Sequence, residues 1–230
     1  MKAVLVLVLV LLAFFACLSL GFNLAEEFKL GEMGVVSPTP VDLNNSSQNN
    51  VLVIVVDHMN QPETNLMAVW FVSLYLMDGS QPALTFAPVY TLYSNGEQSK
   101  VVADSFALND RREPTQQFWN TLSAMNIQWQ GYVMVDLVTA RRFVEWSGMY
   151  GDPPQALLTA LGNPLEGQAM AGQLCQSISS AASRPPVDVN WSELVPDHLQ
   201  TNLRLESGML FWQRMTHASP PVRCEILPPS

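Results

Sequence analysis

Positive charge is scarce in this chain of 230 residues. Eleven lysines and arginines stand against twenty aspartates and glutamates, which gives a formal net charge of −9. No basic cluster is longer than the pairs Arg111–Arg112 and Arg141–Arg142. Proteins that bind nucleic acid neutralise its phosphates with patches of lysine and arginine. The sequence therefore argues against nucleic acid as a partner.

Familiar catalytic and metal-binding motifs are missing as well. The chain has no G-x-S-x-G, no P-loop and no G-x-G-x-x-G pattern. The three histidines, His58, His198 and His217, stand apart from one another and lack the spaced acids or cysteines of a metal site. Motifs alone therefore indicate no catalytic residue, and we expect no cofactor.

Charged residues of both signs are few, at 13% of the chain, whereas hydrophobic residues make up 48%. Such a composition is typical of a well-buried globule and not of a disordered chain. Without the apolar N-terminus, about 200 residues remain, which is enough for one domain with a sizeable core but not for two.

One long hydrophobic run is present, in residues 1–22, where only Lys2 is charged. A run of about 20 apolar residues can cross a bilayer as a helix. Because the core of a signal peptide is usually shorter, an uncleaved anchor is favoured, although Ser19 and Gly21 leave a cleavage site open. Lys2 before the run and glutamates after it predict export of the remainder. We expect the protein at the extracytoplasmic face of the cell membrane, or secreted if the segment is cleaved.

Cysteine is rare, and export gives the three cysteines different roles. Cys17 lies in the membrane segment, which leaves Cys175 and Cys224 as a pair in an oxidising compartment. We expect a disulfide between them, since it would attach the C-terminal tail to the domain. Two unrelated buried thiols are the alternative.

The chain divides into four parts. A polar linker over residues 23–50 follows the membrane segment, residues 51–216 form the domain, and residues 217–230 form a Pro-rich tail. The apolar strand 51–57 shows no alternation, which indicates burial on both faces.

Strands and helices then interleave along the domain. A hairpin turns at residues 78–80, and a second short apolar strand ends at Asp136. Helices are expected over residues 113–125, from 137 to Gly148, over 154–161 and over about 165–183, followed by two short helices. This order predicts the α/β class, with a mixed central sheet.

Five stretches resemble, in order, the LytR-CpsA-Psr family of cell-envelope proteins over about residues 50–216. They are a first strand with an acid at its exit (VLVIVVDHM), a hairpin (MAVWFVSLYLMDGSQPALTFAPVYT), a helix–strand–helix unit ending in glycine (PTQQFWNTLSAMNIQWQGYVMVDLVTARRFVEWSG), a Gln-rich helix (GNPLEGQAMAGQLCQSISSA) and a closing segment (LVPDHLQTNLRLESGMLFW).

The resemblance implies a three-layer α/β/α sandwich around a mixed sheet, displayed outside the cell on the N-terminal membrane segment. Active family members are understood to transfer a glycopolymer from a polyprenyl-diphosphate carrier to peptidoglycan, with Mg²⁺ at the diphosphate. Such chemistry uses arginines as phosphate ligands and carboxylates as metal ligands.

The chain departs from the family at these charged positions. Asp57 matches the first family acid, but an expected arginine and acid are absent near Asn65-Leu66-Met67-Ala68. In the Pro-Arg-Asp-Thr type motif, Pro88 and Thr91 remain, whereas Val89 and Tyr90 replace the charged pair. Residues 163–183 contain no arginine. We interpret the chain as a pseudoenzyme with a binding or structural role in the cell envelope.

Two roles follow for Asp57. It is either a strand-end residue that hydrogen-bonds the following turn, as a relic of a metal site, or a remaining metal ligand, with Mg²⁺ if the ancestral site still works. Glu63 and Asp136 are candidate helpers.

An apolar pocket could outlive the charged site and hold a polyprenyl lipid or a cell-envelope polymer. Its candidate residues are Trp70, Phe71, Phe86 and Tyr90, for which ordinary core packing is the alternative.

Two further functions remain open. The first is an active glycopolymer–peptidoglycan phosphotransferase whose cations come from the two arginine pairs. The second is a metal-dependent hydrolase, because the first strand also resembles that of sulfatases and phosphatases. In that family Tyr90 would stand where the nucleophile belongs, and the later Asp-His metal cluster is missing.

Overall fold

The computed structural model describes residues 48–61, 63–75, 81–92, 96–147, 164–180, 191–204, 206, 208, 210, 213, 217–218 and 222–227. The predicted membrane segment, the linker up to residue 47, the turn at 78–80, Gly148 and the helix over 154–161 lie outside these residues. Among the helices that are described, none is long and apolar enough to cross a membrane.

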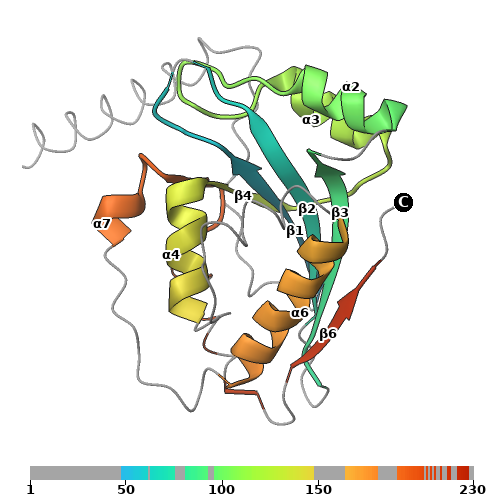
Figure 1. Ribbon diagram of the computed structural model, residues 1–230, viewed down its shortest axis with the longest axis vertical. Coiled ribbons are helices and arrows are strands. Elements are labelled where there is room, and N and C mark those ends of the chain that lie inside the picture. Colours follow the sequence, from blue (N-terminus) through green and yellow to red (C-terminus); the bar gives the residue numbers. More distant parts are fainter. Residues whose placement is uncertain are drawn as a thin grey trace, which may run out of the picture. The chain divides into compact units, whose positions relative to one another are not determined.

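A six-stranded mixed sheet forms the centre of the domain (Figure 1), with the strand order β5-β4-β1-β2-β3-β6. Strand β1 runs antiparallel to β2 and parallel to β4, and β6 lies parallel to β3 at one edge. The strands are β1 (Gln48–Val56), β2 (Leu66–Tyr75), β3 (Ala83–Thr91), β4 (Gly131–Asp136), β5 (Leu199–Thr201) and β6 (Arg223–Ile226). The predicted α/β class and mixed sheet are confirmed.

Strand β1 is buried on both faces, as its unbroken apolar run predicts. Leu52, Ile54 and Val56 contribute to one core, and Val51 and Val55 to the other. Because successive side chains of a strand point to opposite faces, a strand covered on both sides needs apolar residues at every position.

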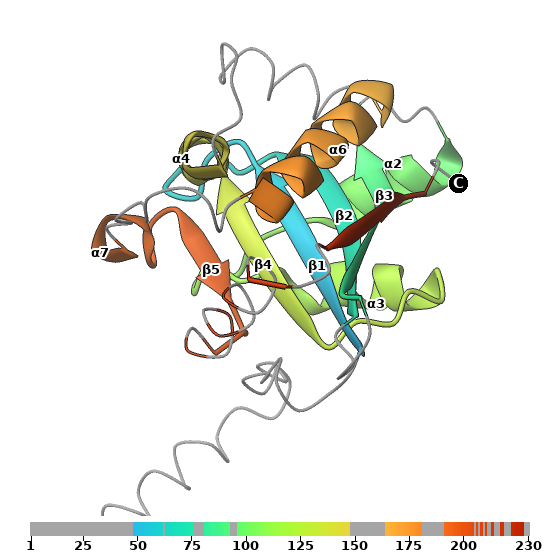
Figure 2. The same cartoon turned by 90° about the horizontal axis from the view of Figure 1, so that it is seen from below.

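Helices pack against both faces of the sheet (Figure 2). Val102 of α2 (Glu97–Ser105) and Phe118 of α3 (Gln116–Ala124) belong to the first core. Ala140 of α4 (Leu137–Ser147) and Ile178 of α6 (Pro164–Ser180) belong to the second. Helices α3, α4 and α6 match predicted helices, whereas α2 was not predicted.

The C-terminal part differs from the prediction in two ways. Two short helices were expected; α7 (Trp191–Leu194) is the first, and residues 206, 208, 210 and 213 are helical as well, but strand β5 lies between them and was not predicted. The segment predicted as a tail supplies the edge strand β6, whose Cys224 and Ile226 pack toward the core. The alternating sequence of Arg223–Ile226 suits an edge strand, and the prolines around it hid this signal.

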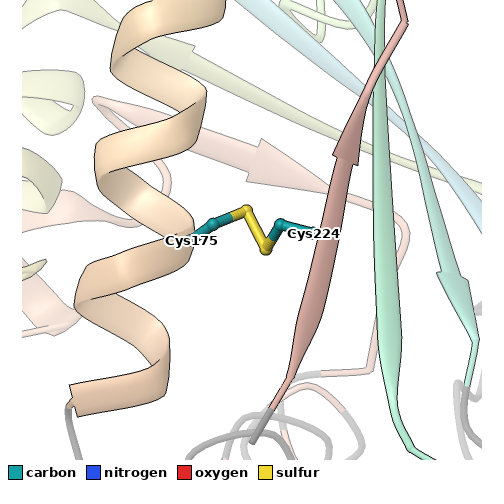
Figure 3. Close-up of a disulfide and its surroundings, with 2 residues drawn as sticks. All are labelled: Cys175 and Cys224. Atoms are coloured by element: carbon teal, nitrogen blue, oxygen red, sulfur yellow. A yellow bond between two sulfur atoms is a disulfide. The ribbon is translucent and has the colours of Figure 1, made fainter.

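A disulfide joins Cys175 of α6 to Cys224 of β6 (Figure 3), the pair expected from the sequence. The two Cα atoms are 5.8 Å apart, and the bond closes a segment with a sequence separation of 49 residues. In the chain-entropy account, closing a loop of this length stabilises the fold by about 4 kcal/mol. The bond therefore fixes the edge strand to the helix that covers it.

Removing this disulfide tests its contribution. We expect the double substitution Cys175→Ala and Cys224→Ala to lower the free energy of unfolding by roughly 2–4 kcal/mol, because the unfolded chain regains its freedom. Urea unfolding with and without a reducing agent measures the effect. Reduction should weaken the unsubstituted protein and leave the variant unchanged; equal stability of all four samples would contradict this role.

Candidate functional site

The motif positions singled out by the family resemblance meet at one edge of the sheet. Strands β1 and β4 are parallel, and Val56 pairs with Asp136, so both strands end at this edge. The start of β2 and the end of β3 lie there as well, since Leu66 pairs with Val56 and Ala68 with Thr91. We call this place the carboxyl edge of β1 and β4. Ligands of α/β proteins commonly bind at such an edge.

Asp57 stands just beyond β1, where its carboxylate binds the loop that leads to β2. Its Oδ1 accepts hydrogen bonds from the backbone N–H of His58 at 2.7 Å and of Asn65 at 2.8 Å. Its Oδ2 accepts one from the side-chain amide of Asn65 at 2.6 Å. These are the contacts of a strand-end residue that orders the following turn.

The same contacts set the charge state of Asp57. Partial burial would raise the pKa of this carboxyl, but the hydrogen bonds from Asn65 and His58 outweigh burial and hold the pKa below its usual value. Hydrogen bonds to a carboxylate favour its ionised form. Asp57 is therefore ionised at neutral pH, with its oxygens already occupied by donors of its own loop.

Apolar side chains fill the positions where the resemblance leads one to expect charges. Leu66 and Tyr90 are buried in the core beneath α2 and α3, and Val89 packs against that core. Burial, together with the charge of Asp104, raises the pKa of Tyr90. The residues at the positions where the resemblance predicts charges thus contribute to packing.

The four aromatic residues proposed for an apolar pocket do not share one face of the sheet. Trp70 and Phe86 belong to the core beneath α4 and α6, whereas Tyr90 and Phe71 belong to the core beneath α2 and α3. Neighbouring residues of a strand point to opposite faces, which separates Trp70 from Phe71. One pocket lined by all four is therefore excluded.

Two hollows lie elsewhere on the described part of the chain. One, of about 530 Å³, lies between α6 and β6, beside the disulfide and next to Val222 and Ile226. The other, of about 210 Å³, lies where Tyr132 of β4 meets β5 and its preceding loop. None of the four aromatic residues lines either hollow.

An aspartate–histidine pair at the carboxyl edge was not anticipated from the sequence. Asp136 is 2% exposed, and its Oδ2 lies 2.5 Å from Nδ1 of His198. Its Oδ1 accepts hydrogen bonds from the backbone N–H groups of Val138 and Thr139, both at 3.0 Å, and so caps the first turn of α4. The hydroxyl of Thr139 donates to the carbonyl of His198 at 2.8 Å. Together these bonds attach the start of β5 to the junction of β4 and α4.

The sequence offered only part of this signal. An acid at the end of a short apolar strand made Asp136 a candidate helper of a metal site at Asp57. Its partner lies 62 residues further on, in a segment expected to be helical, and nothing in the local pattern connects the two.

Arg112 reaches the same edge from the loop between α2 and α3. Its guanidinium donates a hydrogen bond to Oδ1 of Asn60 and lies 3.4 Å from Oδ1 of Asp197. The second predicted arginine pair, Arg141 and Arg142, is exposed on α4. Glu63 is exposed in the loop after β1. Within the described ranges, no group of three or more acids, histidines or cysteines has the arrangement of a metal site.

Asp57 should make the free energy of unfolding depend on pH in the acidic range. A carboxyl whose pKa is lower in the folded chain than its value of 3.8 in the unfolded chain stabilises the fold above that pH, and this stabilisation disappears as pH falls. We expect Asp57→Asn to unfold more easily than the unsubstituted protein at pH 7 and to approach it at low pH. Urea unfolding between pH 7 and pH 2 tests this, with Asp110→Asn as an exposed control; parallel curves for Asp57→Asn would refute it.

The contact between buried Asp136 and half-buried His198 should contribute more to stability than the side chain of the exposed His58 does. We expect His198→Ala to lower the free energy of unfolding by roughly 2–3 kcal/mol, because it leaves a buried carboxylate oxygen without its partner. Asp136→Ala should cost more, since the helix cap is lost too. The exposed His58 is the matched control, and His58→Ala should change stability by less than about 0.5 kcal/mol. Equal effects at His198 and His58 would show that the pair is not a structural contact.

No protein-family model matches the chain. No match is found among curated proteins either. Among solved structures, TagT bound to LIIa-WTA is similar over 85% of this chain and 82% of its own, with a TM-score of 0.51 and 12% identity. TagT bound to LI-WTA is similar over 83% and 85%, with the same TM-score and identity.

A protein described as a transcriptional regulator from Enterococcus faecalis is similar over 79% of this chain and 76% of its own, with a TM-score of 0.50 and 12% identity. TagT is a LytR-CpsA-Psr protein. The chain therefore has the fold of the LytR-CpsA-Psr proteins, as the resemblance of its sequence motifs predicts.

Proposed function

We propose that this chain is a membrane-anchored, extracytoplasmic LytR-CpsA-Psr-like domain that binds a cell-envelope component and has lost transferase activity. In this proposal the domain is a three-layer α/β/α sandwich, and residues 1–22 hold it at the membrane. The observation that carries the proposal is the packing at the carboxyl edge. Leu66 and Tyr90 are buried in the core at motif positions where active relatives need charges.

The physical argument concerns the charge of a diphosphate. Its oxygens must be neutralised by fixed cations or a metal ion, and the charge that develops during transfer needs still more stabilisation. Asp57 is negative, and loop donors already occupy its carboxylate. Arg112 is the cation that reaches the carboxyl edge through Asn60, and Asp197 lies beside its guanidinium. This arrangement disfavours both a bound diphosphate and its Mg²⁺.

An apolar ligand suits the chain better than a diphosphate does. The hollow between α6 and β6 has a volume of about 530 Å³, within the usual range for ligand pockets, and Val222 and Ile226 form part of its wall. A polyprenyl chain or the apolar part of another envelope molecule could occupy it. That TagT, of the same fold, has been solved with LI-WTA bound supports an envelope ligand for this domain.

Two other functions predict different behaviour. An active glycopolymer–peptidoglycan phosphotransferase would have to use Arg112 and Asp57 in a rearranged site with Mg²⁺. A purely structural envelope protein would bind no ligand. The metal-dependent hydrolase is the remote alternative, and it would require a metal at Asp57.

Native mass spectrometry separates these functions. The full-length chain would be purified gently from host membranes, and the spectrum repeated after addition of Mg²⁺ and a polyprenyl diphosphate. We expect a co-purified apolar ligand and no gain in diphosphate binding on adding Mg²⁺. Asp57→Ala is the matched variant and should give the same spectrum.

Two results would count against the proposal. Tight diphosphate binding that requires both Mg²⁺ and Asp57 would indicate a working transferase site. A protein that is purified without a ligand and binds none of the envelope lipids added to it would indicate a purely structural role.

A further inference from the structure

The smaller hollow, which we call the β4–β5 pocket, offers an unusual set of polar groups. It has a volume of about 210 Å³ and is formed by β4, β5, the loop before β5 and the residue that follows Arg112. Its polar wall consists of Glu113, Tyr132, Gln200 and Thr201, and its apolar wall of Val195, Pro196 and Leu199. Neither Asp57 nor the hollow beside the disulfide is part of it.

Gln200 has a buried oxygen that lacks a partner. Its amide nitrogen donates a hydrogen bond to the carbonyl of Arg111 at 3.0 Å, which fixes the orientation of the amide group. Its Oε1 is buried and accepts no hydrogen bond from the residues that the structure describes. Turning the amide over would not help, because Oε1 would then face the carbonyl of Arg111. A buried acceptor without a donor is costly and calls for an explanation.

Tyr132 and Glu113 add further oxygens, one from the phenol and two from the carboxylate. Tyr132 is 4% exposed and lines the pocket, and its hydroxyl has no hydrogen-bond partner among the described residues. Burial, and next the negative charge of Glu113, raise the pKa of Tyr132 to about 12, so the phenol is neutral. Glu113 and Tyr132 line the same pocket.

Hydrogen-bond donors, in contrast, are few: apart from the phenol O–H of Tyr132, the described donors of the polar wall already have a partner. The hydroxyl of Thr201 donates to the carbonyl of Tyr132 at 2.6 Å and accepts from the backbone N–H of Leu203. The amide nitrogen of Gln200 already donates to the carbonyl of Arg111, and none of the described side chains that line the pocket is a lysine, an arginine or a histidine. The pocket thus has acceptors to spare and almost no donors.

We propose that the β4–β5 pocket binds the primary ammonium group of a small amine. An ammonium group has three N–H donors and one positive charge. Glu113 supplies the opposite charge, and the oxygens of Gln200 and Tyr132 accept the remaining hydrogens. The apolar wall around Val195 and Leu199 takes up the methylene groups attached to the nitrogen.

Other ligand classes fit less well. A phosphate or carboxylate would meet Glu113 with no cation in the pocket wall. A sugar presents hydroxyl groups that donate and accept in equal number, whereas this pocket mainly accepts. The acidic balance of the chain, with a net charge of −9, also attracts cations and not anions. This site goes beyond the proposed function and does not depend on it.

Binding of n-butylammonium to the full-length protein tests the proposal. The titration would follow the backbone amide signals of Tyr132 and Gln200 by nuclear magnetic resonance, with n-butanol, butyrate and sodium ions as comparison probes. We expect saturable shifts with n-butylammonium, far weaker ones with n-butanol and none with butyrate. Glu113→Gln should weaken binding by about tenfold, the usual effect of losing a hydrogen bond to a charged group.

Two further variants separate a loss of ammonium binding from a loss of the folded state. Tyr132→Phe removes only a hydroxyl that has no described partner, so the fold should survive while the affinity falls. Glu206→Gln changes an exposed carboxylate elsewhere and should bind as the unsubstituted protein does. The proposal is overturned if n-butylammonium causes no saturable shift, if Glu113→Gln binds equally well, or if sodium ions alone reproduce the shifts, which would indicate a site for a simple cation.

Discussion

Burial of strand β1 on both faces is the constraint on which the rest of the structure depends. Its side chains enter both cores, so its neighbours β2 and β4 and the helices above and below are all positioned around it. Polar groups that serve β1 can lie only at its two ends. Asn50 near its start binds the carbonyl of Gln128 and the hydroxyl of Ser73, and Asp57 beyond its end binds the following loop.

Under the proposed function, the carboxyl edge of β1 and β4 is where a charged binding site has been lost while the fold was kept. Its polar side chains bind one another: Asp57 holds Asn65, Asp136 holds His198, and Arg112 contacts Asn60 and Asp197. Each contact attaches a loop to the sheet. The described part of this edge is therefore held together by these bonds, and Arg112, which already has two partners there, is its described cation. This supports a domain that has kept the family's shape while its charged site became structural.

The sequence predicted those features that local patterns encode. Unbroken apolar runs located β1 and β4, and helical spacing located α3, α4 and α6. The only two cysteines of the sequence beyond the predicted membrane segment form the disulfide. Contacts between segments far apart in the chain could not be predicted from local patterns. The partner of Asp136 is His198, in a segment that resembled a helix, and β6 lies in a Pro-rich stretch that gains its strand partner only through β3. Trp70 and Phe71 face opposite sides of the sheet because they are neighbours on one strand, and this could have been predicted from the sequence.

A transfer assay tests the proposed loss of function most directly. The proposal is that the domain keeps the LytR-CpsA-Psr fold but has no transferase activity. The purified protein would be incubated with Mg²⁺, a labelled polyprenyl-diphosphate-linked glycopolymer and peptidoglycan, beside an active family member as a positive control. We expect no label on peptidoglycan above the level without protein. Label that appears with this protein, requires Mg²⁺ and disappears in Asp57→Ala would contradict the account and establish a working transferase.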